Sequence, residues 1–319
     1  MRLRLCATLV ALMLRATLSA QTPVVDYHQH LFCPAAAAVV TGDSRSTGIS
    51  ARDVVALLDQ AGIRRALILS VAYTWGKASR TPVEDEYEHV RAENDWTAQQ
   101  VAQYPDRLRA FCSVNPLKPY ALEEITRCSR DPGLQRGLKL HFGNSDVDLD
   151  NPENVAQVRK VFAAANDYGM AIVVHMRTSI DNQRRYGAAQ ARVFLNELLP
   201  AAPRVPIQIA HLAGAGGYEP AVAAALGVFV DAIGLQDGRM KNVLFDVTAV
   251  VDAATQPAQL EEIAARIRLI GVGRILYGSD AAATPATFPK AGWAAFRRLP
   301  LTTAEFDTIA ANILPYMRD

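Results

Sequence analysis

The stretch VVDYHQHLFCP, positions 24–34, begins as a short apolar strand and ends with two histidines one residue apart. Side chains alternate between the two faces of a strand, so His28 and His30 are predicted to share one face, and Tyr27 and Gln29 the other. The turn HQHLFCP contains no glycine. A doubly wound sheet normally binds its ligand through a glycine-rich first turn, which makes that fold the weaker alternative.

Seven more short apolar runs follow the first strand at regular intervals. They are RALILSV at 65–71, RAFCSV at 109–114, GLKLH at 137–141, MAIVVH at 170–175, VPIQIAH at 205–211, NVLFDVT at 242–248 and RILYGSD at 274–280. Helical patterns fill the gaps at 50–63, 84–104, 119–130, 152–168, 187–199, 217–226, 257–270 and 303–313. This alternation, without a linker or a change in composition, predicts a single (β/α)8 TIM barrel with its active site at the C-terminal ends of the strands.

The composition favours a small-molecule partner. The chain has 319 residues, of which 50% are hydrophobic, and 33 Lys and Arg side chains balance 32 Asp and Glu. Half the chain being apolar is enough for a large core. No basic run or basic patch with interleaved aromatic residues is present, so the sequence offers no footprint for nucleic acid.

The first 20 residues have the order of a secretory signal peptide. Arg2 and Arg4 precede the apolar run 5–14, and Leu18-Ser19-Ala20 supplies small residues for cleavage. The apolar run is about half of the ~20 residues that cross a bilayer, so no membrane span is expected. We expect residues 1–20 to be removed and the barrel at 21–319 to be periplasmic or secreted.

Three cysteines remain after this segment: Cys33, Cys112 and Cys128. An odd number without a CxxC pair indicates neither a disulfide framework nor a structural zinc site. Three buried thiols are favoured over one disulfide and a free thiol.

Five of the six histidines fall at the C-terminal ends of predicted strands, where this fold carries its catalytic residues. They are His28, His30, His141, His175 and His211, while His89 falls inside a predicted helix. Neutral imidazole binds zinc well, and a catalytic zinc commonly takes three protein ligands and water. Asp280 ends the last strand and adds a carboxylate. The shared location of these side chains predicts a divalent metal site.

The motifs DYHQHLF, GLKLHF, IVVHM, IAHLAGAGG and ILYGSDAA resemble the strand ends of the amidohydrolase superfamily. Within it the chain is most similar to the amidohydrolase-2 branch, which contains aminocarboxymuconate semialdehyde decarboxylase. The resemblance spans about 24–315 and includes YPDRLRAFCSVNP and IAANILPYM. It implies one divalent metal, usually zinc, held by His28, His30, His175 and Asp280. It also implies that His211 acts on the metal-bound water or the substrate, with Asp280 a second candidate for proton transfer.

The strand 137–141 carries a lysine and a histidine on one face. Alternation turns Lys139 and His141 inward and Leu138 and Leu140 outward. In two-metal members of the superfamily a lysine on this strand is carbamylated, so a two-metal site with modified Lys139 stays open. We favour Lys139 and His141 as groups that face the substrate.

The loop after 170–175 contains Arg177, whose planar guanidinium suits a carboxylate or phosphate, and we name it as a candidate for an anionic substrate. Arg184 and Arg185 are expected to be solvated or ion-paired. The favoured reaction is hydrolysis, in which metal-activated water attacks an amide, ester or lactone carbonyl of a small substrate. Nonoxidative decarboxylation of an unsaturated or aromatic acid is the first alternative, and an exported non-catalytic binding barrel is the second. Association of copies is left open.

Overall fold

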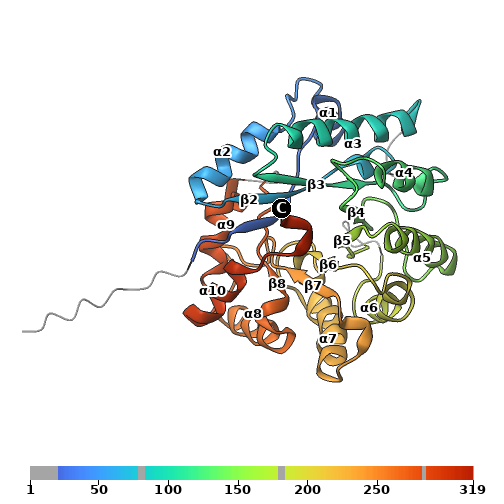
Figure 1. Cartoon of the computed structure of the whole chain (residues 1–319). Helices are drawn as coiled ribbons and strands as arrows, with labels where there is room; N and C mark the ends of the chain where they lie inside the picture. The colour runs from blue at the N-terminus through green and yellow to red at the C-terminus, as the bar shows by residue number, and fades with distance from the viewer. Residues whose placement is uncertain (1–20, 78–82, 179–183, 282–284, 319) are drawn as a thin grey trace, which may run out of the picture.

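The computed structural model describes residues 21–77, 83–178, 184–281 and 285–318, so the predicted signal peptide lies outside the described residues. Its centre is an eight-stranded parallel sheet in which each strand pairs with the next one in the chain. The strands are β1 (Val25–Gln29), β2 (Arg65–Leu69), β3 (Leu108–Ser113), β4 (Gly137–His141), β5 (Ala171–His175), β6 (Ile207–Ile209), β7 (Val243–Asp246) and β8 (Ile275–Leu276). Main-chain hydrogen bonds of 2.8 Å from Tyr27 to Tyr277, and from Asp280 to His28, bring β8 beside β1. The sheet thus forms a nearly closed barrel, and the predicted TIM barrel is confirmed (Figure 1).

Helices surround this barrel (Figure 1). They are α1 (Pro34–Thr41), α2 (Ala51–Ala61), α3 (Glu86–Ala102), α4 (Ala121–Cys128), α5 (Pro152–Asp167), α6 (Ala188–Val193), α7 (Pro220–Gly234), α8 (Pro257–Ile270), α9 (Pro289–Phe296) and α10 (Thr303–Ala311). Seven of the eight predicted helical ranges each contain one of these helices. The eighth, 217–226, overlaps α7, which starts and ends later. The sequence analysis missed α1 and α9, two helices of 8 residues that each begin with a proline. No described helix is both long and apolar enough to cross a membrane.

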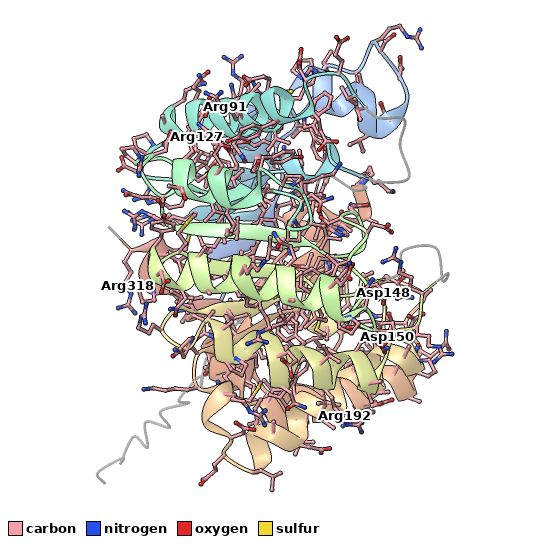
Figure 2. All side chains as sticks on the ribbon, turned by 90° about the vertical axis from the view of Figure 1, so that its right-hand side faces the viewer. Arg91, Arg127, Asp148, Asp150, Arg192 and Arg318 are labelled. Atoms are coloured by element: carbon pink, nitrogen blue, oxygen red, sulfur yellow. A yellow bond between two sulfur atoms is a disulfide. The ribbon has the colours of Figure 1, made fainter. Side chains whose placement is uncertain are left out.

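The half of the barrel interior nearer the N-terminal ends of the strands is apolar. Val25 and Tyr27 of β1 meet Phe111 of β3 and Val173 of β5 there, and the C-terminal segment closes this end with Met317. Figure 2 labels Arg318 at this end and Asp148 and Asp150, from the loop after β4, at the opposite end. The C-terminal ends of the strands therefore open away from the chain terminus.

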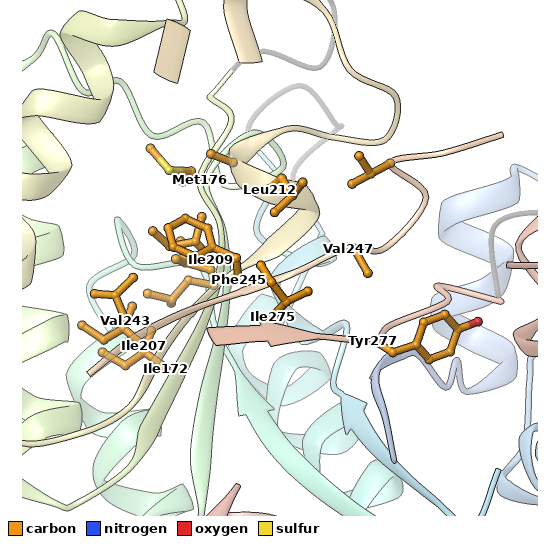
Figure 3. Close-up of a cluster of buried hydrophobic side chains, with 14 of the residues drawn as sticks. Ile172, Met176, Ile207, Ile209, Leu212, Val243, Phe245, Val247, Ile275 and Tyr277 are labelled. Carbon is orange, nitrogen blue, oxygen red and sulfur yellow. The ribbon is translucent and has the colours of Figure 1, made fainter. Parts of the chain in front are cut away.

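The outward faces of the strands form a second apolar layer under the helices. Figure 3 shows part of it, including Ile172 of β5, Ile207 of β6 and Phe245 of β7, all of which are buried. Leu138 and Leu140 of β4 belong to the same layer, as predicted. Burial on this side fixes the register of each strand, so the intervening side chains must face the interior.

Strand β1 contains a bulge. Between Asp26 and Gln29 it takes three steps where β2 takes two, which inserts one extra residue into β1. Tyr27 consequently packs inside the barrel, while Nε2 of the next residue, His28, lies 3.3 Å from Nζ of Lys139, also inside. The prediction that Tyr27 points away from the histidine face is therefore wrong, because strict alternation does not hold across a bulge.

A disulfide joins Cys112 of β3 to Cys128 of α4, with a Cα–Cα distance of 6.2 Å, and Cys33 is the free thiol. The favoured prediction of three buried thiols is wrong. Cys112 lies on the outward face of β3 and Cys128 on the inward face of α4, so the packing of helix on strand brings together two residues that are 16 apart in sequence.

Candidate active site

The C-terminal ends of the strands bring five imidazole rings into one cluster. Ring centroids are 5.1 Å apart for His30 and His28, and 4.8 Å apart for His28 and His211. His175 lies 4.9 Å from His211, and His141 stacks on His175 at 3.9 Å. All five rings are buried. The predicted meeting of these histidines at one rim of the barrel is what the structure shows.

The outer nitrogen of two rings is bound to main-chain carbonyls. Nδ1 of His30 lies 2.7 Å from the Leu69 oxygen, and Nδ1 of His211 lies 2.9 Å from the Thr248 oxygen. A carbonyl oxygen can only accept a hydrogen bond, so each Nδ1 carries a proton. In the neutral rings the lone pair is then on Nε2, the atom that would face a metal or a substrate.

His28 is held from both sides. Its Nδ1 lies 3.1 Å from Oδ2 of Asp246, and its Nε2 lies 3.3 Å from Nζ of Lys139. The carboxylate accepts and the ammonium donates, so His28 also carries its proton on Nδ1. Lys139 is fully buried, and burial lowers its pKa to about 8. It therefore remains mostly charged at neutral pH.

His175 and His141 differ in their ring contacts. Nε2 of His175 is buried and has no hydrogen-bond partner among the described residues, as expected of an atom reserved for a ligand. Nδ1 of His141 accepts the main-chain N–H of Asn144 at 3.1 Å. Neutral His141 thus carries its proton on Nε2 and donates from that atom, whereas Nε2 of His28, His30 and His211 carries a lone pair.

Asp280 reaches the cluster through a sharp turn after β8. Its backbone has a positive φ of 58°, and its N–H is bonded to the His28 carbonyl at 2.8 Å. One potential ligand atom from each of His28, His211 and Asp280 lies within 4.8 Å of the other two. His30 adds its Nε2 at 3.7 Å from Oδ1 of Asp280. This grouping is compact enough to hold an ion.

Backbone strain gathers at the same rim. His211, Leu212 and Ala213 after β6, Ala249 after β7 and Asp280 after β8 all have positive φ angles, between 49° and 67°. Residues other than glycine rarely adopt this conformation, and such residues concentrate at functional sites.

Burial keeps four of these imidazoles neutral, those of His28, His30, His141 and His175. It lowers the pKa of His28 and of His30 to about 3, with a further contribution from the Lys139 charge. Burial likewise places the pKa of His141 and of His175 well below 6.5. Neutral rings offer lone pairs, which is the form that binds metals.

The sequence matches a family model described as Amidohydrolase over residues 25–312. The chain belongs to this amidohydrolase family. The resemblance found in the strand-end motifs is therefore confirmed. No curated protein matches this amidohydrolase closely.

Solved structures share the fold of this amidohydrolase at low identity. The 5-carboxyvanillate decarboxylase LigW of Sphingomonas paucimobilis has 16% identity and a TM-score of 0.59, over 91% of this chain and 97% of that one. A dihydroxybenzoic acid decarboxylase from Polaromonas, solved with bound manganese and an inhibitor, has 17% identity and a TM-score of 0.60, over 91% and 95%. A protein described as a probable 2-pyrone-4,6-dicarboxylic acid hydrolase of Acinetobacter baumannii has 14% identity and a TM-score of 0.58, over 90% of this chain and 95% of that one.

Arg177 is less well placed in this amidohydrolase than the sequence suggests. Its Nη1 lies 2.5 Å from Oε1 of Glu219, and its guanidinium lies 6.0 Å from the centre of the Tyr186 ring. The charge that it would offer to a substrate is already met by a carboxylate, so a substrate role for Arg177 stays a prediction. Arg184 pairs with Asp146, as expected for a salt-bridged loop residue.

The sequence analysis missed two polar residues of the site, Asp246 at the end of β7 and Gln208 in β6. Both are buried inside the barrel, and Nε2 of Gln208 lies 2.7 Å from Oδ2 of Asp246. The same signal that selected Asp280, a carboxylate at the C-terminal end of an apolar strand, was present in NVLFDVT.

Proposed function

We propose that this amidohydrolase is a metal-dependent hydrolase that cleaves an amide, ester or lactone bond of a small substrate. The observation that carries the proposal is the cluster of His28, His211 and Asp280, whose potential ligand atoms lie within 4.8 Å of one another. His30 and His175 extend this cluster. We assign His28, His30, His175 and Asp280 to one divalent metal ion.

The chemistry of these side chains fits such an ion. The protons of His28 and His30 on Nδ1 place their lone pairs on Nε2, where that of His28 faces Nζ of Lys139 at 3.3 Å and would turn to the ion. Buried Nε2 of His175 has no partner among the described residues. Imidazole nitrogens with one carboxylate suit zinc, and also manganese or iron. We propose zinc because histidines predominate. A lone pair on each ring, set by a hydrogen bond on its far side, is the usual support for a metal ligand.

A divalent ion bound there supplies an activated water and polarises a carbonyl group. His211 supplies proton transfer. Its Nδ1–H is bonded to Thr248, so its Nε2 can accept a proton from the attacking water and pass it to the leaving group. Asp280 is the second candidate for this transfer, because its side chain is more open to solvent than that of the neighbouring His30. The exposed fractions are 23% for Asp280 and 8% for His30.

Lys139 and His141 suit an anionic group on the substrate. Lys139 offers a buried ammonium, and His141 offers an Nε2–H, since its Nδ1 is already occupied by Asn144. Two buried donors on the same strand would be poorly satisfied by an apolar substrate. We therefore propose a small substrate that carries a carboxylate near the scissile bond.

Nonoxidative decarboxylation is the second candidate, and the same Lys139 favours it, because a buried ammonium can hold the carboxylate that is lost. Arg177, which the sequence analysis named as a candidate for an anionic substrate, is paired with Glu219. A non-catalytic binding barrel is the weakest candidate, since it would need neither His211 nor Asp280 as a proton carrier.

Turnover in ¹⁸O-water on ester, lactone and aromatic-acid panels separates these functions, with metal content measured on the same protein. We expect one metal equivalent and ¹⁸O in the product. The variant His211→Ala should lose about 10²–10⁴-fold in kcat. His89→Ala is the control, because His89 of α3 stacks on Trp75 outside the cluster. Release of carbon dioxide with no ¹⁸O in the organic product would instead establish the decarboxylase, and bound metal without any turnover the binding protein.

We also propose that residues 1–20 direct export and are removed. The disulfide between Cys112 and Cys128 supports this, because disulfides persist mainly in oxidising compartments. N-terminal sequencing of protein from the periplasm or medium should begin at Gln21. Protein that keeps Met1 and stays in the cytoplasm would contradict export.

A further inference from the structure

Asp246 is a buried carboxylate that contacts two residues of the proposed site. It ends β7 and is 0% exposed. Oδ2 lies 3.1 Å from Nδ1 of His28, and Oδ1 accepts the main-chain N–H of His211 at 2.9 Å. We propose that Asp246 is a positioning residue, which fixes the His28 proton on Nδ1 and holds His211 so that both Nε2 lone pairs face the reaction centre. This inference rests on the proposed function.

The orientation of His28 follows from the hydrogen bonds of Asp246. Its Oδ1 accepts two main-chain N–H groups and its Oδ2 accepts the Gln208 amide N–H, so the carboxylate faces groups that donate. It therefore acts as the acceptor toward Nδ1 of His28 as well. Lys139, which donates toward Nε2 of His28 at 3.3 Å, requires the same tautomer from the opposite side.

His211 depends on Asp246 through its backbone. Its φ and ψ are 55° and 35°, a left-handed conformation that residues other than glycine rarely adopt. Oδ1 of Asp246 accepts the N–H of His211 and, at 3.2 Å, that of Thr248. The carbonyl of Thr248 in turn accepts Nδ1–H of His211. One carboxylate thus organises both the strained turn and the ring that projects from it.

The remaining donor to Asp246 is also fixed. Nε2 of Gln208 lies 2.7 Å from Oδ2 of Asp246 and 3.3 Å from the Tyr27 carbonyl, while its Oε1 accepts the Tyr316 hydroxyl at 3.2 Å. Turning this amide round would lose the bonds to Asp246 and Tyr27 and keep only one to the Tyr316 hydroxyl, which can also accept. Every group that faces the carboxylate is therefore a donor in this structure. The two main-chain N–H groups cannot become acceptors, Gln208 can do so only by giving up its bond to Tyr27, and the ring of His28 can do so by moving its proton to Nε2.

The variant Asp246→Asn keeps the shape of the side chain and replaces one oxygen by a donor. Because the N–H groups of His211 and Thr248 cannot turn round, the new amide nitrogen is expected at the Oδ2 position, beside both His28 and Gln208. Gln208 must then turn its oxygen toward this nitrogen, and the His28 proton is expected to move to Nε2, which removes the lone pair that would bind the metal.

The chain offers a matched control in Asp26. This carboxylate is also 0% exposed and accepts four hydrogen bonds, from the main chain of His28 and Ser279 and from the side chains of Gln29 and Ser279. None of these four bonds involves an imidazole ring. Oε1 of Gln29 has no partner among the described residues, so its amide can turn round to accept from Asn in Asp26→Asn.

The test combines ¹⁵N NMR of the histidine rings in metal-free protein with Zn²⁺ affinity from competition with a chromophoric chelator. His28→Gln identifies the His28 signal. We expect His28 to be protonated on Nδ1 in the unmodified protein and on Nε2 in Asp246→Asn. Zn²⁺ should bind Asp246→Asn about 10–100-fold more weakly, and Asp26→Asn within about threefold of the unmodified protein.

An Nε2-protonated His28 in the unmodified protein overturns the proposal, and this measurement needs no variant if Asp246→Asn fails to fold. It is also overturned if Asp246→Asn keeps the original tautomer and affinity, or if Asp26→Asn loses affinity equally. A tautomer change in a protein that binds no Zn²⁺ would sustain the positioning role and refute the proposed metal-dependent function.

Discussion

Gly278 lies two residues after the end of β8 and packs against His28, and its replacement by alanine should weaken metal binding in a folded protein. A Cβ atom at this position would lie 2.2 Å from Oγ1 of Thr248 and 2.7 Å from Cβ of His28. Ordinary van der Waals contacts begin at 3.4 Å. His28 must therefore move by roughly 0.7 Å, or β8 must shift by a similar amount, to relieve the contact.

This displacement is large on the scale of metal coordination, where ligand distances hold to about 0.2 Å. For Gly278→Ala we expect at least about tenfold weaker Zn²⁺ binding, equivalent to about 1.4 kcal/mol. Turnover should fall about 10²-fold, since misplacing reacting groups by about 1 Å has that effect. Overpacking should lower the free energy of unfolding by about 1–3 kcal/mol.

Chelator competition, steady-state kinetics and urea unfolding of the metal-free protein measure these three effects. Gly238→Ala is the control, because a Cβ at Gly238 meets nothing within 4 Å. It should match the unmodified protein in all three assays. If Gly278→Ala bound Zn²⁺ and turned over like Gly238→Ala, the close packing of β8 on His28 would have no bearing on the site, and the argument would be refuted.

Three further predictions concern the charge, the pH response and the disulfide. Lys139→Met should raise KM for carboxylate-bearing substrates but leave KM for neutral esters within about threefold. The free energy of unfolding should be unchanged or higher, because a buried ammonium is costly. Equal losses on both substrate classes would contradict the role of Lys139. In metal-free protein, His28 and His30 have pKa values of about 3, below 6.5 in the unfolded chain, so the unfolded state takes up their protons first as pH falls. Their stability contribution is complete well above pH 6.5 and should fall by about 3 kcal/mol between pH 6.5 and 5, measured by urea unfolding; a flat profile would refute neutral burial. Reducing the disulfide of Cys112 and Cys128, which are 16 residues apart, should lower the unfolding free energy by about 3 kcal/mol, and an unchanged urea midpoint would contradict this.

The barrel and the meeting of the histidines could be predicted because they depend on local patterns. Each strand is recognisable in the sequence as a short apolar run, and in this fold the C-terminal ends of all strands lie at one rim of the barrel. His141 and His175, at the ends of β4 and β5, were therefore placed correctly, and their rings stack at 3.9 Å. The inward direction of Lys139 followed from alternation alone, because β4 has no bulge.

The remaining features depend on contacts between distant segments. The bulge in β1, which turns Tyr27 inward, is defined by the pairing with β2 and by nothing within β1 itself. The disulfide depends on how α4 packs on β3. Arg177 was predicted from its position in the loop after β5, but its partner Glu219 is 42 residues further along the chain. Pairings of this kind are visible only once the chain is folded.

Asp246 shows a different limit. It was visible in the sequence as the one carboxylate in NVLFDVT, but its importance comes from its contacts with His28 and Gln208, which are 218 and 38 residues away. A rule that examines every polar residue at a strand end, and not histidines alone, would have selected it.

The most direct test of the account is a crystal structure of the zinc-loaded protein with anomalous diffraction measured at the zinc absorption edge. The account predicts one anomalous peak between His28, His30, His175 and Asp280, with His211 beside it and free to carry a proton. A peak elsewhere in the barrel, or none in protein equilibrated with zinc, would contradict the assignment of these four side chains to a metal.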